Sequence, residues 1–267
     1  MRNLVRRVLD AADERRRLDE LTSPATKVAL RSLFLDYRRA AEEGARLPSV
    51  WDTGFRVFSQ FDEDGVILFL VAVAGEGPRR VVDLGAGNGV HASNCANLLL
   101  NLGFGGLLVD ADEEKVAWGR RFYARHPDSK ERPPALVQSF LTRENVNDVV
   151  GGAGFVGEVD LLSVDVDGND YWLWEALECV RPRLVVVEAH PELGRDEHVT
   201  PYDAEFRWAS GASGGASLAA FVRLGERLGY RPVGSNQYGF NVFFAREDVA
   251  PAVPAVPLEE LFARAGI

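Results

Sequence analysis

Carboxylate side chains are concentrated between positions 160 and 172, where the sequence is DLLSVDVDGNDYW. Asp165, Asp167 and Asp170 follow an apolar run that is typical of a β-strand. Clustered carboxylates repel one another unless cations or hydrogen bonds compensate for the charge. The segment does not fit a calcium loop, because Asp170 replaces the required Gly and Ala176 the required Glu. We therefore expect a functional role for Asp165, with a divalent cation or a positively charged ligand as its partner.

Glu188 ends the next apolar run, residues 183–187, and precedes His190 by two positions. If the two runs are neighbouring strands, Glu188 lies beside Asp165 and Asp167. These three carboxylates form an oxygen-rich set that suits Mg²⁺ or Mn²⁺ better than Zn²⁺. His190 could be a fourth ligand, a general base near neutral pH, or an ordinary histidine of a surface loop.

A glycine-rich turn, VVDLGAGNG, covers positions 81–89 and joins an apolar run to a segment expected to be helical. Glycines let the backbone pass close to a ligand, and a helix N-terminus offers free N–H groups. The dinucleotide fingerprint G-x-G-x-x-G is incomplete, because Val90 occupies its last position. Asp83 stands two positions before Gly85 in the remaining G-x-G-x-G pattern. A tight strand-to-helix turn without a ligand would have the same pattern.

Asp110 ends the following apolar run and is separated from Asp112 by one residue. A carboxylate at the end of the second strand can accept both hydroxyls of a ribose, which is how an adenosyl group is commonly held. Asp112 precedes two glutamates and fits the N-cap of a helix. We assign Asp110 to a ribose and Asp112 mainly to capping.

These side chains need a fold that brings several strand ends together. Short apolar runs at 81–84, 106–110, 135–137, 160–164 and 183–187 alternate with helical stretches such as 92–102, 113–125 and 171–180. Strands buried on both faces lose the alternation of apolar and polar residues, so this succession predicts a parallel sheet covered by helices. A helix at 218–228 and strands at 230–233 and 240–245 predict a final antiparallel hairpin at the sheet edge.

Both ends of the chain are expected to add helices to a main domain at 58–248. Leu4, Val8 and Ala11 recur at helical spacing, and Ser23 with Pro24 marks the start of a second helix that ends near Gly44. The second helix should bury its apolar residues, which are Val28, Leu30, Leu33, Phe34 and Tyr37. Residues 1–57 would form a cap, a lid or the arm of a homodimer. Residues 249–267 form a proline-rich tail with a short helix.

The composition of the 267 residues excludes several classes of protein. With 46% hydrophobic and 26% charged residues, it is that of an ordinary globular protein. A net charge of −10 argues against a nucleic-acid partner. Cys95 and Cys179 are too few for a disulfide framework or a cysteine-type zinc site. The longest apolar run, 66–74, is too short to span a membrane, so we expect a cytoplasmic protein without a membrane partner.

Two further patterns are better explained by structure than by chemistry. Residues 211–215 fit G-x-S-x-G, but no apolar strand precedes them and every histidine comes before Ser213, which is the wrong order for that hydrolase class. A flexible loop explains these residues better. Trp174 is expected to pack a helix on the sheet.

Taken together, these segments resemble class I S-adenosylmethionine-dependent methyltransferases, and more narrowly the FkbM-like group of natural-product and sugar O-methyltransferases. The resemblance covers about residues 57–247. It rests on FSQFDEDG at 58–65, the turn at 83–89, the strand end at Asp110, LSVDVDGNDYW at 162–172, GYRPVG at 229–234 and GFNVFF at 239–244. The fold that it implies is α/β, with a Rossmann-like, mostly parallel seven-stranded sheet, an antiparallel C-terminal hairpin and an N-terminal helical extension.

The resemblance implies a set of residues for S-adenosylmethionine. The methionine part would contact Asp83, Gly85 and Gly87, the ribose Asp110, and the adenine edge Ser139 and Phe140, while Gln60 and Glu63 would close over the cofactor. Further cofactor-binding residues would be Ala86, Asn88, Ala111 and Asp165. In related metal-dependent sugar methyltransferases, carboxylates after the fourth and fifth strands bind Mg²⁺, and Asp165 and Glu188 occupy those places. Close relatives often carry Glu-Tyr-Asn where this chain has Glu188-Ala189-His190, which makes His190 a candidate particular to this chain.

We therefore expect an enzyme that methylates the hydroxyl of a small molecule such as a sugar or a natural-product scaffold. Asp165 would hold the hydroxyl near the cofactor, and His190 or a bound Mg²⁺ or Mn²⁺ would assist its deprotonation. The loop at 191–215 is the expected substrate lid. Three alternatives are a methyltransferase acting on nitrogen, carbon or a protein, a cofactor-binding protein with lost or altered activity, and an NAD-dependent oxidoreductase.

Overall fold

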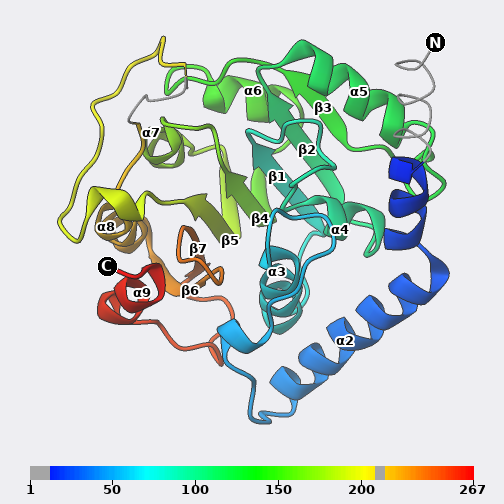
Figure 1. Ribbon diagram of the computed structural model, residues 1–267, viewed down its shortest axis with the longest axis horizontal. Helices are drawn as coiled ribbons and strands as arrows, with labels where there is room; N and C mark the ends of the chain where they lie inside the picture. Colours follow the sequence, from blue (N-terminus) through cyan, green and yellow to red (C-terminus); the bar gives the residue numbers. More distant parts are fainter. Residues whose placement is uncertain (1–12, 208–213) are drawn as a thin grey trace.

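A seven-stranded sheet forms the centre of the computed structural model, which describes residues 13–207 and 214–267 (Figure 1). The strand order is β3-β2-β1-β4-β5-β7-β6, and β7 runs antiparallel to both of its neighbours while the other pairs are parallel. This arrangement confirms the predicted α/β fold with a C-terminal hairpin. The strands are β1 (Arg80–Leu84), β2 (Gly105–Asp110), β3 (Ala135–Gln138), β4 (Gly157–Val164), β5 (Val180–Glu188), β6 (Tyr230–Ser235) and β7 (Asn241–Arg246).

Helices cover both faces of the sheet. The helices that pack into the core on one face are α2 (Pro24–Glu42), α3 (Glu63–Val73), α4 (Ala96–Leu100) and α5 (Glu113–Tyr123). Those on the other face are α6 (Val146–Gly152), α7 (Asp170–Ala176), α8 (Leu218–Leu228) and α9 (Leu258–Ala265). Two single turns, η1 (Val50–Asp52) and η2 (Pro191–Leu193), lie in the connections. Alternate residues of each strand face the two cores, as Val81 and Val82 of β1 do.

Trp174 belongs to the second core, as predicted, with only 3% of its surface exposed. Its ring lies 5.0 Å from that of Phe244 and 5.9 Å from that of Tyr230, measured between centroids. These contacts join α7 to β6 and β7, so the hairpin is fixed to the rest of the sheet by aromatic packing as well as by strand pairing.

Helix α3 is one of two helices that the sequence pattern did not assign, the other being α6. All eleven residues of α3 are buried, including the acidic residues of its first turn. A helix that is apolar on every side lacks the periodicity that marks an amphipathic helix. Within residues 13–207 and 214–267, no helix combines the length and the apolar character needed to cross a membrane.

Helix α2 begins at the predicted place, because the Ser23 hydroxyl accepts a hydrogen bond from the Thr26 N–H at 3.2 Å. Its inner face buries Leu30 and Phe34 against the core that contains α3. The prediction that Val28 is buried is wrong, since 65% of its surface is exposed. Positions two residues apart on a helix point to different sides, so Val28 and Leu30 cannot share the inner face. Leu4, Val8 and Ala11 lie outside the described residues, whereas residues 13–21 are helical.

Two predicted helices are shorter than their sequence patterns suggest. The helix expected at 92–102 begins only at Ala96, because the Ser93 hydroxyl accepts hydrogen bonds from the N–H groups of Cys95 and Ala96. The helix expected at 171–180 ends at Ala176, and β5 already begins at Val180. In both cases side-chain and strand contacts decide the boundary, and these are not contained in apolar periodicity.

We predict that Phe34→Ala lowers the free energy of unfolding by about 3 kcal/mol, because it removes a ring that α2 buries in the core. Leu35→Ala is the matched control on the opposite face, where 55% of the side chain is exposed, and should change it by less than about 0.5 kcal/mol. Urea denaturation measures both values. Similar losses in the two variants would contradict the packing of α2.

Candidate active site

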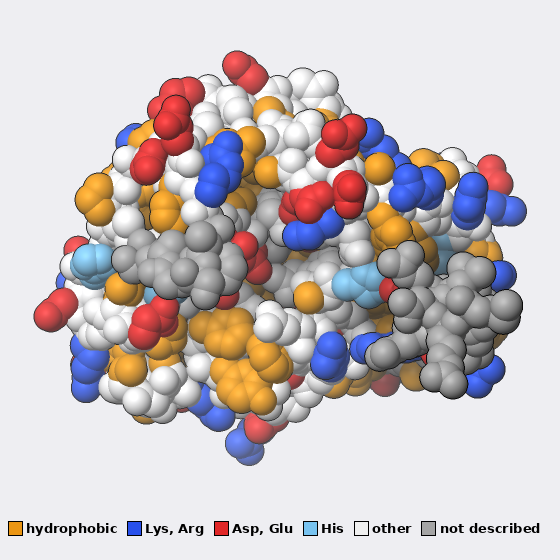
Figure 2. Space-filling model, turned by 45° about the horizontal axis from the view of Figure 1, so that its top comes forward, with side chains coloured by type: hydrophobic (Ala, Val, Ile, Leu, Met, Phe, Trp, Pro, Cys, Tyr) orange, Lys and Arg blue, Asp and Glu red, His pale blue; other side chains and the backbone are white. Residues whose placement is uncertain are grey.

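A cavity of about 750 Å³ lies at the carboxyl ends of β1, β2, β4 and β5. The space-filling view shows acidic side chains around a hollow in one face of the molecule (Figure 2). The chain leaves each of these parallel strands at the same edge of the sheet, which is where ligands bind in open α/β folds. Most of the predicted site residues line the cavity, namely Gln60, Gly85, Ala86, Gly87, Asp110, Ala111, Ser139, Phe140, Asp165, Asp167 and Glu188.

The glycine-rich turn forms one wall of the cavity. The N–H groups of Gly85 and Ala86 both donate to the Val109 carbonyl, at 2.9 and 3.0 Å, so the turn is fixed against β2. Gly85 has φ +89°, and a Cβ there would lie 1.6 Å from the Asp165 carbonyl oxygen. Gly87 has φ +59° but no atom within 4 Å of a Cβ position. Gly85 is therefore required by the contact with Asp165, and Gly87 by its backbone angle alone.

Asp110 connects this turn to the end of β2. Its carboxylate accepts hydrogen bonds from the Gly87 N–H at 2.7 Å and the Asp112 N–H at 2.8 Å. Asp112 accepts from the N–H groups of Glu114 and Lys115 and caps α5, as predicted. Asp112 thus caps a helix, whereas the Asp110 carboxylate joins the end of β2 to the glycine-rich turn.

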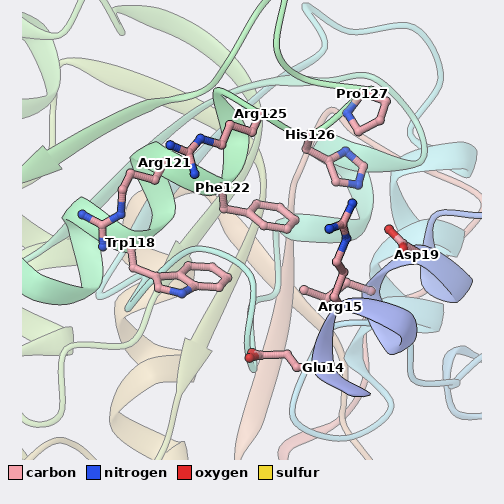
Figure 3. Close-up of a pocket in the computed structure, with 10 residues that line it drawn as sticks. Glu14, Arg15, Asp19, Trp118, Arg121, Phe122, Arg125, His126 and Pro127 are labelled. Atoms are coloured by element: carbon pink, nitrogen blue, oxygen red, sulfur yellow. The ribbon is translucent and has the colours of Figure 1, made fainter. Parts of the chain in front are cut away.

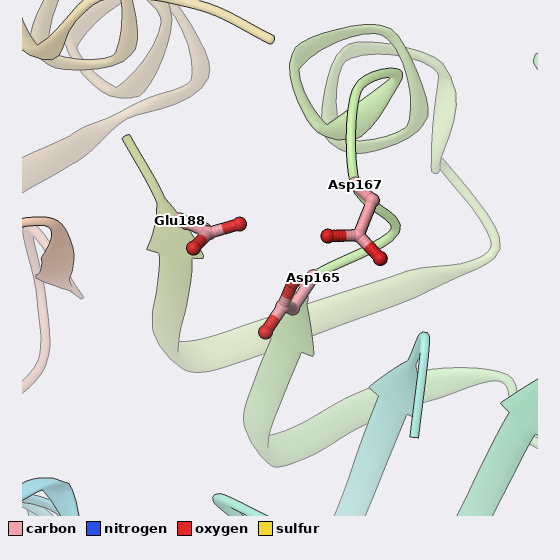
Figure 4. Close-up of side chains that lie close together, drawn as sticks. All are labelled: Asp165, Asp167 and Glu188. Atoms are coloured by element: carbon pink, nitrogen blue, oxygen red, sulfur yellow. The ribbon is translucent and has the colours of Figure 1, made fainter. Parts of the chain in front are cut away.

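Asp165, Asp167 and Glu188 form a compact carboxylate group (Figure 4). One oxygen from each lies within 4.8 Å of the others, and Figure 4 shows the three side chains directed toward a common space. Burial raises the pKa of Asp165 well above its ordinary value, and the negative charge of Glu188 adds to the shift. Burial also raises the pKa of Glu188 to about 7, and Asp170 contributes. Among the described residues, no salt bridge involves any of the three carboxylates.

Asp170 has a different role from its neighbours in the sequence. It is completely buried, and its two oxygens accept hydrogen bonds from the N–H groups of Val166 and Gly168, at 2.7 and 2.8 Å. These bonds hold the turn that carries Asp167, whose φ of +56° is unusual for a residue other than glycine. The fourth carboxylate of the segment therefore shapes the loop and does not face the cavity.

Asp83 lies beneath the turn and does not line the cavity. Only 3% of its surface is exposed, and burial raises its pKa to about 6, although hydrogen bonds from Ser163, Cys95 and Ser93 oppose the shift. Above that pH the residue is an anion in a poorly solvated place. A carboxylate held there at a cost to stability makes the electrostatic potential of the cavity more negative.

Three other predicted site residues do not line the cavity either. Glu63 has no exposed surface and accepts hydrogen bonds from the side-chain amides of Asn236 and Asn241. Asn88 uses its side-chain oxygen within its own turn, where it accepts from the N–H groups of Val90 and His91. His190 also lies off the cavity surface, beside Gly215, and its ring interacts with Glu192 at 2.7 Å through Nδ1.

The Nε2 atom of His190 is buried and has no hydrogen-bond partner among the described residues. A Cβ at Gly215 would lie 2.5 Å from this atom, so the Gly215 backbone covers it. His190 is close enough to Glu188 that a positive charge on its ring would lower the pKa of the Glu188 carboxyl group. The histidine therefore influences the carboxylate group without lining the cavity. The roles predicted for His190, as a ligand or a general base, stay predictions.

Several cavity residues were missed by sequence reasoning, among them Lys115, Phe206 and Arg207. The Arg207 guanidinium lies over the Phe140 ring, 3.2 Å from its centroid, and Phe206 packs against Gly168. Both residues belong to the loop predicted as a lid, but no spacing pattern marks a residue that reaches the cavity from an irregular loop. The G-x-S-x-G serine, Ser213, lies outside the described residues.

A second hollow, of about 430 Å³, lies between the helix at 13–21 and α5 (Figure 3). Trp118 and Phe122 stack there with ring centroids 5.3 Å apart, and Arg121 and Arg125 stand beside them. None of its lining residues comes from the carboxyl end of a strand. The candidate site is therefore the larger, acidic cavity.

No protein-family model matches the sequence, and no curated protein matches it. The fold is similar to that of magnesium protoporphyrin IX methyltransferase from Synechocystis PCC 6803 with bound S-adenosylmethionine, at 15% identity and a TM-score of 0.46 over 82% of this chain and 96% of that one. It is also similar to the N-terminal domain of EvdMO1, crystallised with S-adenosylhomocysteine and D-fucose, at 14% identity and a TM-score of 0.45 over 79% and 95% of the two chains.

A third similar structure is the glycopeptide N-methyltransferase MtfA in complex with S-adenosylmethionine. It is 15% identical, with a TM-score of 0.41 over 71% of this chain and 96% of that chain. Identities of 15% or less and TM-scores below 0.5 do not decide a function. The function proposed below rests on the geometry of this chain's own cavity.

We predict that Gly85→Ala lowers the free energy of unfolding by about 3 kcal/mol or more, because the new methyl group collides with the backbone of Asp165. Gly87→Ala is the control in the same turn and meets only backbone strain, which costs about 1–2 kcal/mol. Equilibrium denaturation of the two variants tests the difference. Equal losses would mean that the contact at Gly85 relaxes freely.

We further predict that Asp83→Asn becomes more stable relative to the parent chain as the pH rises. The folded-state pKa of Asp83 is about 6 and its ordinary value is 3.8, so the unfolded chain ionises first and the parent chain loses stability as the pH rises from about 4 to about 6. The difference in unfolding free energy should change by up to about 3 kcal/mol across this window and stay constant above it. Denaturation curves across this range measure it, and a difference independent of pH would contradict the burial argument.

Proposed function

We propose that this chain is an S-adenosylmethionine-dependent methyltransferase that methylates a hydroxyl of a small molecule, such as a sugar or a natural-product scaffold, with help from Mg²⁺ or Mn²⁺. The observation that carries the proposal is the concentration of carboxylates, Asp83 beneath the cavity and Asp165, Asp167 and Glu188 in its wall, without a salt-bridge partner among the described residues. Such a site favours positively charged ligands. A sulfonium cofactor and a divalent cation are both of this kind.

The residues around Gly87 and Asp110 fit the cofactor. The space beside Gly87 is open, which allows a ligand to approach the backbone closely. Asp110 is fixed by two N–H groups at the end of β2, the position from which a carboxylate can accept the hydroxyls of a ribose. Ser139 and Phe140 stand further along the same wall, where an adenine would lie. The cavity volume of about 750 Å³ is within the range of small-molecule sites.

The group formed by Asp165, Asp167 and Glu188 fits a hard divalent cation. Its donors are oxygens close enough to share one ion. Burial raises the pKa values of Asp165 and Glu188, and no salt bridge among the described residues compensates for their charge. Oxygen donors with few protein ligands are typical of Mg²⁺ sites, where water completes the coordination. Asp165 and Glu188 are the residues we expect to hold the ion, with Asp167 as the exposed third ligand.

When bound, S-adenosylmethionine supplies a methyl group on a positively charged sulfur, and the divalent cation supplies positive charge that favours an ionised acceptor oxygen. With the cofactor bound, Asp165 and Glu188 would orient the acceptor hydroxyl toward the methyl group, and one of these carboxylates would take the hydroxyl proton. The methyl group would pass from sulfur to the acceptor oxygen and leave S-adenosylhomocysteine. His190 stabilises the charge on Glu188 from behind the wall in this arrangement.

We predict that the protein binds S-adenosylmethionine and S-adenosylhomocysteine but not NAD in calorimetric titrations. Asp110→Ala should weaken the binding of both adenosyl ligands at least about tenfold, because the ribose loses its acceptor. Glu113→Gln is the control on the helix that follows, since Glu113 is exposed and does not line the cavity, and it should change the affinity less than about threefold. A folded protein that binds neither adenosyl ligand would overturn the proposal.

The same titrations with and without Mg²⁺ or Mn²⁺ address the metal. Asp165→Asn should abolish binding of Mn²⁺ alone, which electron paramagnetic resonance detects in the absence of any acceptor. Tight binding of S-adenosylmethionine with no transfer to any hydroxyl compound would instead indicate a cofactor-binding protein with lost or altered activity. Transfer to nitrogen, carbon or a protein side chain would correct the substrate class.

A further inference from the structure

Helix α3 begins with two acidic residues, Glu63 and Asp64, whose side chains are almost completely buried. In the described part of the chain, neither residue lines the acidic cavity and neither forms a salt bridge. Acidic side chains are rarely buried unless hydrogen bonds or an opposite charge satisfy them. The hydrogen bonds that these two carboxylates accept therefore indicate what they do in the fold.

Asp64 binds the backbone of the segment that precedes α3. Its Oδ2 atom accepts hydrogen bonds from the N–H groups of Val57, Phe58 and Ser59, at 2.7, 2.6 and 2.7 Å. The Ser59 hydroxyl donates to the same oxygen at 2.8 Å. The Oδ1 atom is buried and has no partner among the described residues. A single carboxylate oxygen therefore holds three consecutive peptide groups.

Glu63 holds the chain on the other side of Gln60. Its Oε2 atom accepts a hydrogen bond from the Phe61 N–H at 2.8 Å. Its Oε1 atom accepts from the side-chain amides of Asn236 and Asn241, at 2.8 and 2.9 Å. Both oxygens of this carboxylate are thus in use, and they tie Phe61 to the C-terminal hairpin.

Gln60 lies between these two attachments. Within the fully described segment 57–61, it is the residue that lines the cavity. Gln60 is exposed, whereas Ser59 has no exposed surface. Both chain neighbours of Gln60 donate their N–H groups to a buried carboxylate. A residue whose backbone is already fixed loses less entropy when its side chain contacts a ligand.

Two glycines show how closely the preceding chain packs against the start of α3. A Cβ at Gly65 would lie 2.1 Å from the Thr53 carbonyl oxygen, and a Cβ at Gly54 would lie 2.4 Å from Oδ2 of Asp62. The Gly65 N–H also donates to the Phe55 carbonyl at 3.0 Å. This stretch of chain therefore cannot move closer to the helix, and the carboxylates act on a backbone that is already confined.

We propose that Asp64 and Glu63 are positioning residues that hold Gln60 where its side-chain amide contacts bound S-adenosylmethionine. The inference rests on the proposed function, because the cofactor is the ligand that Gln60 contacts. Gln60 alone touches the cofactor. The two carboxylates act through the peptide groups on either side of it.

The test measures the affinity of the full-length protein for S-adenosylhomocysteine by calorimetry. Gln60→Ala should weaken binding about fivefold or more, because a hydrogen bond to the ligand is lost. Asp64→Ala should weaken it by a similar factor, since three N–H groups lose their acceptor. Asp64→Asn should restore the affinity to within about twofold of the parent chain, because the amide oxygen can take the place of Oδ2. Glu63→Gln should weaken binding despite its equal shape, because its single oxygen can serve only one of the two sides.

Double variants separate positioning from a general loss of stability. If the carboxylates act through Gln60, then Gln60→Ala combined with Asp64→Ala or with Glu63→Gln should bind no more weakly than Gln60→Ala alone. Phe34→Ala removes buried packing in α2 and lines no part of the cavity, so it is the control for reduced stability and should keep the parent affinity. Urea denaturation shows which variants are folded, and Glu63→Gln carries the test if Asp64→Ala does not fold.

Three results would overturn the inference. They are an unchanged affinity in Gln60→Ala, an unchanged affinity in the folded carboxylate variants, and losses that multiply in the double variants. A folded parent chain that does not bind S-adenosylhomocysteine is a separate result, which would overturn the proposed function and this inference with it.

Discussion

The mutual repulsion of carboxylates at one buried edge of the sheet is the constraint on which the rest of this structure depends. Parallel strands end at the same edge, so the acidic residues that follow β1, β2, β4 and β5 are brought together whatever their distance in the sequence. Burial and the negative charge of Glu188 consequently raise the pKa of Asp165, and burial and the charge of Asp170 raise the pKa of Glu188. A cavity with this charge is stable only when hydrogen bonds, protons or cations compensate.

The chain supplies part of this compensation through its backbone. The carboxylates of Asp110 and Asp170 each accept hydrogen bonds from two backbone N–H groups of neighbouring turns. These bonds hold the loops in place. Burial raises the pKa of Asp170 in spite of these donors, as it does for Asp83, Asp165 and Glu188. The carboxylates differ in placement: Asp170 shapes a loop and does not line the cavity, whereas Asp165 and Glu188 line it.

Hydrogen bonds to a buried carboxylate also connect the site to the C-terminal hairpin. Glu63 is buried, and it bonds to Asn236 and Asn241 and thereby fixes both the hairpin and the segment before α3. Since Asn241 pairs with Glu188, the position of a cavity carboxylate depends on a residue that never reaches the cavity. The resemblance to methyltransferases implies that Glu63 closes over the cofactor, and in the structure its buried carboxylate bonds to the hairpin. A buried charge with three donors can organise a site without touching its ligand.

The sequence by itself determined the order of the strands in the chain, the antiparallel hairpin, the start of α2 and the carboxyl ends of the strands to within two residues, because apolar runs, caps and turns are local properties. It could not assign α3, which is apolar on every side and so has no periodic signal, and it wrongly placed Val28 in the core. Only the tertiary structure decided which carboxylates face the cavity, that His190 lies behind its wall, and that Phe61 meets Tyr238. These facts depend on contacts between residues far apart in the chain, and such contacts are set by packing and by shared hydrogen bonds that no local pattern contains.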